Sequence, residues 1–362
     1  MKKNKFLGSV ESAVLDFRRL FTEYGYRPFK MSKFEEYELY AKNKDFLVSD
    51  RVITFNDTNG KLLALKPDVT LSIIKNTLDE PGIKTKLCYD EKVYRPAGST
   101  NRFKEITQTG LECIGDIDLY DIYEVVDLAA AGLSLISDSF VLDLSHLGVL
   151  SALLSDMGKD LDFSNKIIKL FSEKNSHDIL KVCKQNGVSE RDANTLAAFT
   201  EIYGDRATVL QRLSKLNLSE NAEKAVDELT ELSKLLDCSD FSDKIKFDFS
   251  IVNDMNYYNG FVFKGFLQNI PEGVLSGGRY DSLMKKMGKK SGAVGFAVYL
   301  DLLEAIENPA PEYDVDTLII YNNSTDKKEI LKTVKSAVKE GKTVTAQKNV
   351  PSGLKFKEKI TL

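Results

Sequence analysis

The sequence is poor in the residues that build metal centres, disulfide frameworks and hydrolytic triads. Its 362 residues include only two histidines and four cysteines. The cysteines are widely spaced with no C-x-x-C pair, so we expect buried free thiols, and neither a metal site nor disulfides. His146 and His177 have no partner serine or cysteine in a recognisable catalytic arrangement. Nothing in these residues indicates a catalytic centre.

Long apolar runs and an excess of basic charge are also missing. No run of 18 apolar residues occurs, and the N-terminal lysines precede an amphipathic segment, so we expect a cytoplasmic chain without membrane contact. A net charge of -4 with interspersed signs gives no electrostatic reason for tight nucleic-acid binding. No P-loop or dinucleotide fingerprint is present. With 43% apolar residues, the chain can bury a sizeable core in one large domain with smaller units.

Residues 86–115 are typical of two strands joined by a long loop. An apolar run is followed by a Pro-Ala-Gly-Ser-Thr-Asn cluster and then by a returning alternation of polar and apolar residues. Side chains two and four positions apart share one face of a strand, so Gln108 and Glu112 point into the same space. The hairpin could therefore present a recognition surface, or simply a solvated polar face.

A helix is predicted from Pro67 to about Thr77, with proline in its first turn. Asp68 and Thr70 lie near its N-terminus, where side-chain oxygens commonly cap free backbone donors. Capping alone would explain both residues. A role in binding is the alternative.

The later segments alternate between helical and sheet character. Residues 150–240 have nearly continuous amphipathic helical periodicity and resemble an inserted helical subdomain. Gly277 and Gly278 follow a strand, where they permit close backbone approach or an unusual turn. We expect a second glycine-spaced helix after Gly292 and Gly295. Residues 314–362 predict a strand, a helix and a strand.

Five motifs in order resemble the catalytic core of histidyl-tRNA synthetases, over roughly residues 5–305. They are LALKPDVT, the hairpin ending FKEITQTGLECIG, NDMNYYNGFVF, GGRYD and AVGFAVYLDLL. The resemblance implies an α+β class II aminoacyl-tRNA synthetase fold, with an antiparallel sheet flanked by helices. We expect a core domain over residues 1–308, with its helical insertion at about 150–240. Residues 309–362 would form a truncated β-α-β unit.

Two branches share this core: the aminoacylating enzymes, and the regulatory subunits of ATP phosphoribosyltransferase. An active synthetase needs arginines aimed at the α-phosphate and pyrophosphate oxygens. At two positions where the family carries arginine, this sequence has Asn253 and Leu302, and the second motif lacks its usual glutamate. Losing one such donor costs about 10²- to 10³-fold in rate. The resemblance therefore favours a non-catalytic regulatory subunit that acts in the first step of histidine biosynthesis, with no catalytic residue and no cofactor.

The amino-acid pocket of the family is retained by resemblance. Asp68, Thr70 and Gln108 occupy positions that hold the ligand α-amino group, while Glu112, Tyr258 and Tyr280 line the imidazole side. A carboxylate, an amide and a hydroxyl suit an ammonium group, and a carboxyl group with tyrosine hydroxyls can satisfy both imidazole nitrogens. Histidine feedback through this pocket is the implied regulation.

The resemblance also implies the partners. They are the short-form catalytic subunit of ATP phosphoribosyltransferase in a hetero-oligomer, by resemblance a hetero-octamer, and a second copy of this chain in a homodimer formed through the core. No tRNA is expected. The alternatives are a divergent histidyl-tRNA synthetase and a free-standing amino-acid sensor or adaptor.

Overall fold

A computed structural model of the chain describes residues 9–47, 49, 51–80, 82–96, 102–216, 218–252, 257–305 and 312–362. The chain divides into two compact units, Met1–Ile306 and Glu307–Leu362, each with its own sheet. The predicted boundary between residues 308 and 309 lies outside the described residues.

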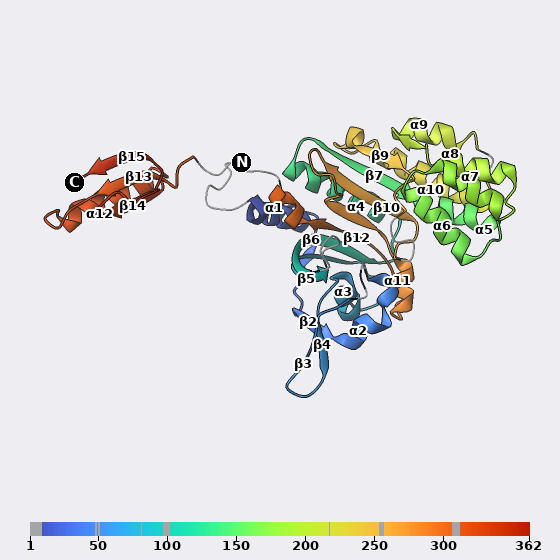
Figure 1. Ribbon diagram of the computed structural model, residues 1–362, viewed down its shortest axis with the longest axis horizontal. Coiled ribbons are helices and arrows are strands. Elements are labelled where there is room, and N and C mark those ends of the chain that lie inside the picture. Colours follow the sequence, from blue (N-terminus) through green and yellow to red (C-terminus); the bar gives the residue numbers. More distant parts are fainter. Residues whose placement is uncertain are drawn as a thin grey trace. The chain divides into compact units, whose positions relative to one another are not determined.

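A mixed, mostly antiparallel sheet forms the centre of the larger unit (Figure 1). Only the β1–β5 and β7–β9 pairs are parallel within the described part of this sheet. In spatial order its strands are β1 (Arg27–Pro28), β5 (Thr85–Pro96), β6 (Phe103–Gly115), β12 (Gly292–Tyr299), β11 (Leu275–Arg279), β10 (Phe261–Leu267), β7 (Phe140–His146), β9 (Ile245–Asp248) and β8 (Tyr203–Gly204). The predicted hairpin over residues 86–115 is confirmed as β5 and β6.

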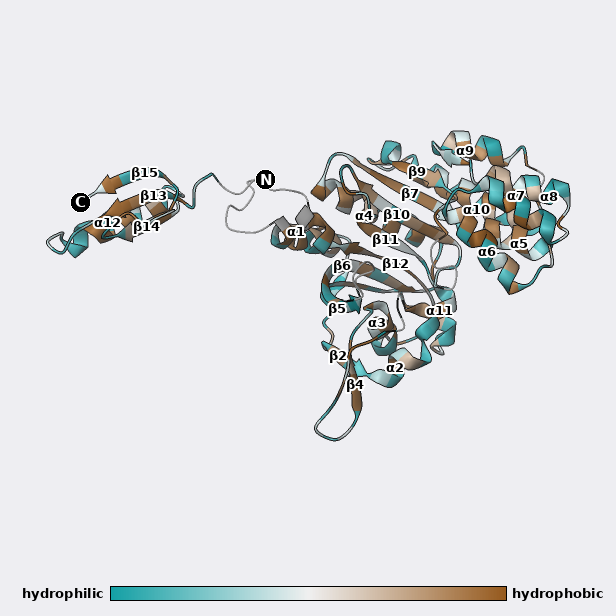
Figure 2. Ribbon diagram, viewed as in Figure 1, coloured by the Kyte–Doolittle hydropathy of each residue, from teal (hydrophilic) through white to brown (hydrophobic). Residues whose placement is uncertain are grey.

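Two helices, α1 (Ser9–Glu23) and α4 (Leu119–Ile136), contribute the main core on one face of this sheet. The ring of Phe21 on α1 meets Phe296 on β12 edge-on, with centroids 5.8 Å apart. Burying one such side chain stabilises the fold by about 1.5–3 kcal/mol. Figure 2 shows the matching apolar colour along the central strands. The N-terminus of α4 is fixed by a reciprocal capping box between Asp118 and Asp121.

Shorter elements, and a second core that includes Tyr40, Leu71 and Leu283, lie on the opposite side of the sheet. The elements are α2 (Tyr37–Lys42), η1 (Lys44–Phe46), α3 (Thr70–Asn76), α11 (Asp281–Lys286) and a small sheet of β2 (Phe34–Glu36), β4 (Leu62–Leu65) and β3 (Thr54–Asn56). The β3–β4 hairpin projects away from this layer (Figure 1). This layer and the central sheet enclose the pocket described below.

The chain between β7 and β9 is mainly helical and gathers beside those strands in Figure 1. Its helices are α5 (Leu147–Asp156), α6 (Leu161–Ser172), α7 (Ser176–Gln185), α8 (Glu190–Phe199), α9 (Arg206–Leu213) and α10 (Glu220–Leu236), followed by η2 (Ser242–Lys244). His146 caps the first of them, because its Nδ1 accepts the Gly148 N–H at 3.2 Å. The ring also meets Glu228 of α10 through Nε2 at 3.2 Å. This histidine joins the helical region to the sheet.

The described part of the C-terminal unit, residues 312–362, is a parallel sheet with one helix. Its strands β13 (Val315–Ile320), β14 (Val344–Gln347) and β15 (Phe356–Thr361) lie in the order β14-β13-β15, and α12 spans Lys327–Lys339. The sequence predicted the first strand, the helix and the second strand, but missed β15. The prediction of a helix after Gly292 and Gly295 is wrong, because that segment is strand β12 followed by η3 (Leu300–Ala305).

Candidate functional site

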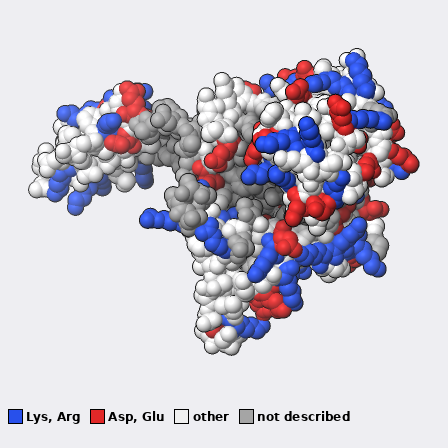
Figure 3. All heavy atoms as spheres, turned by 45° about the vertical axis from the view of Figure 1, so that its right-hand side comes forward, with Lys and Arg blue, Asp and Glu red and all other residues white. Residues whose placement is uncertain are grey.

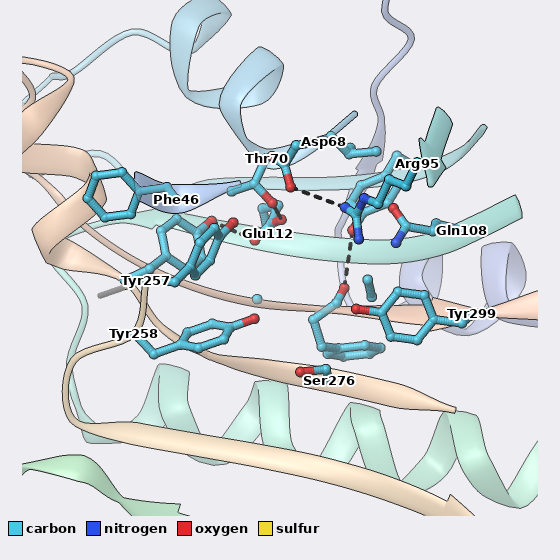
Figure 4. A pocket seen from close by; sticks show the side chains of 16 residues that line it. Phe46, Asp68, Thr70, Arg95, Gln108, Glu112, Tyr257, Tyr258, Ser276 and Tyr299 are labelled. Atoms are coloured by element: carbon cyan, nitrogen blue, oxygen red, sulfur yellow. Dashed lines mark hydrogen bonds and ion pairs between the residues drawn. The ribbon is translucent and has the colours of Figure 1, made fainter. Parts of the chain in front are cut away.

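The register of three neighbouring strands places one set of side chains on the same side of the central sheet. Gln108 and Glu112 of β6 pair with Tyr299 and Gly295 of β12, and paired residues project from the same face. Together with the layer of α3 and η1 they enclose a pocket of about 70 Å³ (Figure 4). It is lined by Phe46, Asp68, Val69, Thr70, Tyr89, Arg95, Gln108, Glu112, Tyr257, Tyr258, Ser276, Tyr280, Gly295, Phe296, Ala297 and Tyr299.

Glu112 is held inside this pocket by two hydroxyl donors. Its Oε1 accepts a hydrogen bond from Thr70 Oγ1 at 2.9 Å, and its Oε2 accepts one from the Tyr280 hydroxyl at 2.5 Å. Only 2% of the residue is exposed. Burial raises the pKa of Glu112 to about 8, although the two hydrogen bonds act in the opposite direction. At neutral pH the carboxyl group is therefore mainly protonated, and it can donate as well as accept.

Asp68 both caps a helix and faces the pocket. Its Oδ1 accepts the Leu71 N–H at 2.9 Å, which satisfies a free backbone donor in the first turn of α3. Its Oδ2 lies 3.5 Å from Nη2 of Arg95, whose Nε donates to the Pro67 carbonyl at 2.5 Å. Burial raises the pKa of Asp68, while the Arg95 charge lowers it. The capping interpretation is thus correct for one oxygen of Asp68, whose other oxygen is directed toward the pocket, and wrong for Thr70, whose hydroxyl donates to Glu112.

The amide of Gln108 belongs to the polar lining of the pocket. The residue is 2% exposed, and its amide makes no hydrogen bond within the described part of the chain. Figure 4 shows this amide beside the Arg95 guanidinium. A buried amide without a partner costs free energy. A ligand that supplied partners would remove that cost.

Aromatic rings form one wall of the pocket. Tyr257 meets Tyr258 with ring centroids 4.7 Å apart, Tyr280 at 5.9 Å and Phe46 at 6.2 Å. Such rings offer flat apolar surface with hydroxyl groups at the edge. This wall suits a small planar group that also forms hydrogen bonds.

Glycines on three adjacent strands make room for these side chains. A Cβ at Gly295 would overlap the carboxylate of Glu112, and one at Gly278 would lie 2.8 Å from Cδ1 of Tyr258. A Cβ at Gly110 would lie 2.6 Å from the hydroxyl of Tyr89. Real Cβ atoms do not approach other atoms this closely, so a larger residue would force the pocket to rearrange. The predicted close backbone approach at Gly278 is present.

All six residues predicted for the ligand pocket line this one cavity: Asp68, Thr70, Gln108, Glu112, Tyr258 and Tyr280. Their contact with a ligand stays a prediction. Asn253 lies outside the described residues. Leu302, in η3, packs against the main core and is not among the described residues that line the pocket.

The predicted ligand set left out several pocket residues, of which Arg95 is the most important. It lies near the end of β5, where it pairs with Lys104 of β6 and shares a face of the sheet with Tyr89. The available signal was this two-residue periodicity, because an even number of positions separates Arg95 from Tyr89 in β5. Phe46 lies outside the predicted motifs, and only the tertiary fold brings it to the pocket, whereas Tyr89 lies in the predicted hairpin and pairs with Gly110 of β6.

Other sequence expectations concern metals, thiols and membranes. No group of three or more metal-ligating side chains occurs among the described residues, and no described helix is long and apolar enough to cross a membrane. Cys88, Cys113 and Cys183 are buried free thiols, but Cys238 is exposed, so the expectation of burial is wrong there. Basic and acidic side chains are intermingled on the surface shown in Figure 3.

Comparisons with known proteins agree on the family. The family model described as Histidyl-tRNA synthetase matches residues 6–303. The ATP phosphoribosyltransferase regulatory subunit of Caldanaerobacter subterraneus subsp. tengcongensis is 31% identical over 290 residues, which cover 79% of this chain and 75% of the relative. The chain belongs to the regulatory-subunit branch of the histidyl-tRNA synthetase family.

Solved structures of this regulatory-subunit family support the fold. A Bacillus halodurans protein described as an ATP phosphoribosyltransferase regulatory subunit/histidyl-tRNA synthetase has a TM-score of 0.82 and 25% identity, with 100% of this chain and 99% of that chain covered. A chain of the Thermotoga maritima ATP phosphoribosyl transferase (HisG:HisZ) complex has a TM-score of 0.63 and 19% identity, covering 83% and 98%. The class II synthetase-like α+β fold predicted for this regulatory subunit is confirmed.

Proposed function

We infer that this chain is a non-catalytic regulatory subunit of ATP phosphoribosyltransferase, and that it acts with the short-form catalytic subunit in the first step of histidine biosynthesis. The observation that carries this conclusion is the combination of a built amino-acid pocket with Leu302 at a position where the family carries a phosphate-binding arginine. In this chain Leu302 packs against the core. Adenylation needs preorganised positive charge at developing phosphate oxygens, and an apolar side chain supplies none.

Histidine is the proposed ligand of the pocket. Asp68, Thr70 and Gln108 would surround its α-amino group, and Glu112, Tyr258 and Tyr280 would surround its imidazole ring. The buried Glu112 carboxyl, with a pKa near 8, could exchange hydrogen bonds with an imidazole nitrogen in either protonation state. The aromatic wall supports this orientation, because a flat imidazole can pack against it. The ring centroids of Tyr257 and Tyr258 in this wall are 4.7 Å apart.

The proposed assembly is a hetero-oligomer with the catalytic subunit, in a hetero-octamer that contains homodimers of this chain. Support comes from the fold shared with a chain of the Thermotoga maritima HisG:HisZ complex. A cytoplasmic location and the absence of a bound tRNA remain predictions of the same hypothesis.

The direct test mixes the purified catalytic subunit with this chain and measures phosphoribosyl-ATP formation. We expect a large rise in rate, co-elution in size-exclusion chromatography, and a lower rate when histidine is added. Unchanged activity together with separate elution would refute the assignment.

A divergent histidyl-tRNA synthetase is the second candidate, because Arg95 lies in the pocket. That guanidinium leaves one cationic group beside the site where an adenylate would form. Histidine-dependent exchange of pyrophosphate with ATP separates the two functions. The regulatory assignment predicts no exchange above background, with a known histidyl-tRNA synthetase as the positive control.

A further inference from the structure

We propose that Asp79 and Ser291 are positioning residues, which form a clasp between the chain segments that follow helices α3 and α11. The clasp keeps two hydroxyl groups, those of Thr70 and Tyr280, on the carboxyl group of Glu112. Neither Asp79 nor Ser291 is among the described residues that line the pocket, so both act through other residues. This inference rests on the proposed function, since the pocket is the proposed histidine site.

Each of the two helices begins next to a residue that holds Glu112. Thr70 is the first residue of α3, and its hydroxyl donates to Glu112 Oε1 at 2.9 Å. Tyr280 directly precedes α11, and its hydroxyl donates to Oε2 at 2.5 Å. Both helices are short, with seven residues in α3 and six in α11. A shift at the far end of either helix therefore also moves the residue at its start.

The clasp joins the chain just beyond these far ends. The Asp79 carboxylate accepts the backbone N–H groups of Lys290 at 2.6 Å and Ser291 at 3.0 Å. The hydroxyl of Ser291 also donates to Asp79 Oδ1. Beside these bonds, Nζ of Lys289 donates to the Thr77 carbonyl at 2.7 Å. These hydrogen bonds connect the segment after α3 directly to the segment after α11.

The charge of Asp79 strengthens the clasp. Hydrogen bonds from the Ser291 hydroxyl and the Lys290 N–H lower the pKa of Asp79, so its side chain is a carboxylate at neutral pH. Two successive backbone N–H groups form a concave donor site that suits an anion. Hydrogen bonds to an ionised acceptor are stronger than those between neutral groups. Removing the carboxylate should therefore release the segment after α11.

Apolar packing between α3 and α11 does not fix the position of the two hydroxyl groups. Leu71 of α3 and Leu283 of α11 belong to the same buried core. The hydrophobic effect is non-directional, whereas a hydrogen bond requires a particular distance and angle. The core holds the helices together, and the clasp supplies the geometric constraint.

The side chains of α11 carry further parts of the pocket wall. Lys286 of α11 donates to Asp45 at 2.7 Å and lies 4.8 Å from the ring centroid of Phe46, which lines the pocket. Asp281, in the first turn of α11, accepts the Ala293 N–H of β12 at 3.0 Å. Movement of α11 would therefore disturb the wall formed by Phe46 as well as the Tyr280 hydroxyl.

Hydrogen exchange measured by mass spectrometry on the full-length chain without ligand tests the clasp. Asp79→Ala should speed the exchange of amides in α3 and α11 by roughly 10-fold, because charged hydrogen bonds that oppose local opening are lost. Amides of the central strand β6 should keep their protection. Ser291→Ala removes only the hydroxyl group, so it should cause a smaller change in the same two helices.

Calorimetry with L-histidine shows whether the clasp acts through the donors to Glu112. Asp79→Ala should weaken histidine binding by roughly 10-fold, since part of the binding free energy is then used to order the pocket. The same substitution in a Thr70→Val, Tyr280→Phe background should cause no further loss, because the hydroxyl groups that Asp79 positions are absent. A merely structural Asp79 would change thermal stability and leave the histidine affinity of the folded chain unaltered.

Lys75→Gln is the matched control. Lys75 lies in the last turn of α3 and pairs with Glu35 at 2.6 Å, so its substitution removes an ion pair from the same helix and leaves the clasp intact. Hydrogen exchange in α11 and the histidine affinity should equal those of the unaltered chain. Thermal unfolding should show that all variants are folded.

Each outcome bears on one claim. Unchanged hydrogen exchange in α3 and α11 of Asp79→Ala would overturn the clasp, whichever ligand binds in the pocket. An equal loss of histidine affinity from Asp79→Ala in both backgrounds would overturn its positioning role through Thr70 and Tyr280. Failure of histidine to bind the unaltered chain at millimolar concentration would refute the proposed ligand, and hydrogen exchange would still decide the clasp.

Discussion

The hydroxyl of Tyr280 donates a hydrogen bond to Oε2 of Glu112 across 2.5 Å, and both residues are almost completely buried. Tyr280 precedes α11, whereas Glu112 belongs to the central strand β6, so one hydrogen bond ties the outer layer to the sheet. The same bond stabilises a carboxyl group that burial pushes toward its protonated form. The pocket and the packing of the two layers therefore depend on each other.

The Tyr280→Phe variant should be less stable by about 1–3 kcal/mol, because a buried acceptor loses its donor while the ring is kept. The pKa of Glu112 should rise further, since the lost hydrogen bond lowers it. Urea denaturation at pH 7 measures the free energy of unfolding. Tyr203→Phe is the control: Tyr203 is 56% exposed, and its change should lie within about 0.5 kcal/mol. Equal effects of the two substitutions would contradict the structural role of the hydrogen bond.

Glu112 should also give the folded chain a pH-dependent stability. Its pKa is raised from 4.5 to about 8, so between these values the folded state keeps a proton that the unfolded state has released. The contribution of Glu112 to the free energy of unfolding is fully present below pH 4.5 and is lost as the pH rises toward 8. The slope is at most about 1.4 kcal/mol per pH unit. Denaturation at several pH values between 5 and 9, a range set by those two values, measures the free energy of unfolding. Its decline with pH should be smaller for Glu112→Gln than for the unaltered chain.

The control for this pH series is Glu201→Gln, a substitution at an exposed position. Its stability profile should run parallel to that of the unaltered chain. If the stability profile of Glu112→Gln were also parallel, then Glu112 would titrate at the same pH in the folded and unfolded states. The conclusion that Glu112 is mainly protonated in the folded chain would then be wrong.

Two substitutions of Asp68 separate capping from ligand contact. Asp68→Asn keeps an oxygen for the Leu71 N–H, so we expect the stability to change by less than about 1 kcal/mol. Asp68→Ala removes the acceptor and should cost about 0.5–2 kcal/mol. Both variants should bind histidine roughly 10- to 100-fold more weakly, because the carboxylate that faces the ammonium is gone. Full histidine affinity in Asp68→Asn would show that Asp68 is only a cap.

Much of this site could be predicted from the sequence, because its main elements follow local rules. The alternation along β6 was enough to place Gln108 and Glu112 on one face, since side chains in a strand repeat every two residues. The helix was predicted from Pro67 but begins at Thr70, so proline is not in its first turn, Asp68 lies just before the helix and Thr70 is its first residue. The strand pattern acts within a single element, so it survives folding unchanged.

The parts that sequence reasoning missed depend on contacts between distant segments. Gly292–Tyr299 has small and apolar residues that suit a helix as well as a strand, and the segment becomes β12 because β6 and β11 pair with its two edges. Arg95 is a regularly paired residue of β5, so strand periodicity gives its face, but its hydrogen bond to the Pro67 carbonyl joins distant segments and could not be read from a local pattern. The third strand of the C-terminal unit, β15, was missed because its alternation is mostly lysine and glutamate.

The contact between Gly295 and Glu112 gives the last prediction. A Cβ at position 295 would overlap both the Glu112 carboxylate and the Leu111 carbonyl, so Gly295→Ala must displace both. We expect a loss of stability of about 1–3 kcal/mol and weaker histidine binding, because overpacking shifts the carboxyl group out of place. Part of the stability loss should disappear in a Glu112→Ser background, where the side-chain overlap is removed and the backbone overlap remains.

The matched control is Gly341→Ala, which adds the same methyl group in the C-terminal unit where no atom lies within 4 Å. Gly341 has a φ of +76°, so the substitution should cost stability through backbone strain alone, by about 1 kcal/mol. Histidine affinity should be unaffected there, because the position belongs to the other unit. Strictly additive effects of Gly295→Ala and Glu112→Ser on the free energy of unfolding would show that the two residues do not constrain each other. In that case the glycine would be required only for the close approach of β12 to β6.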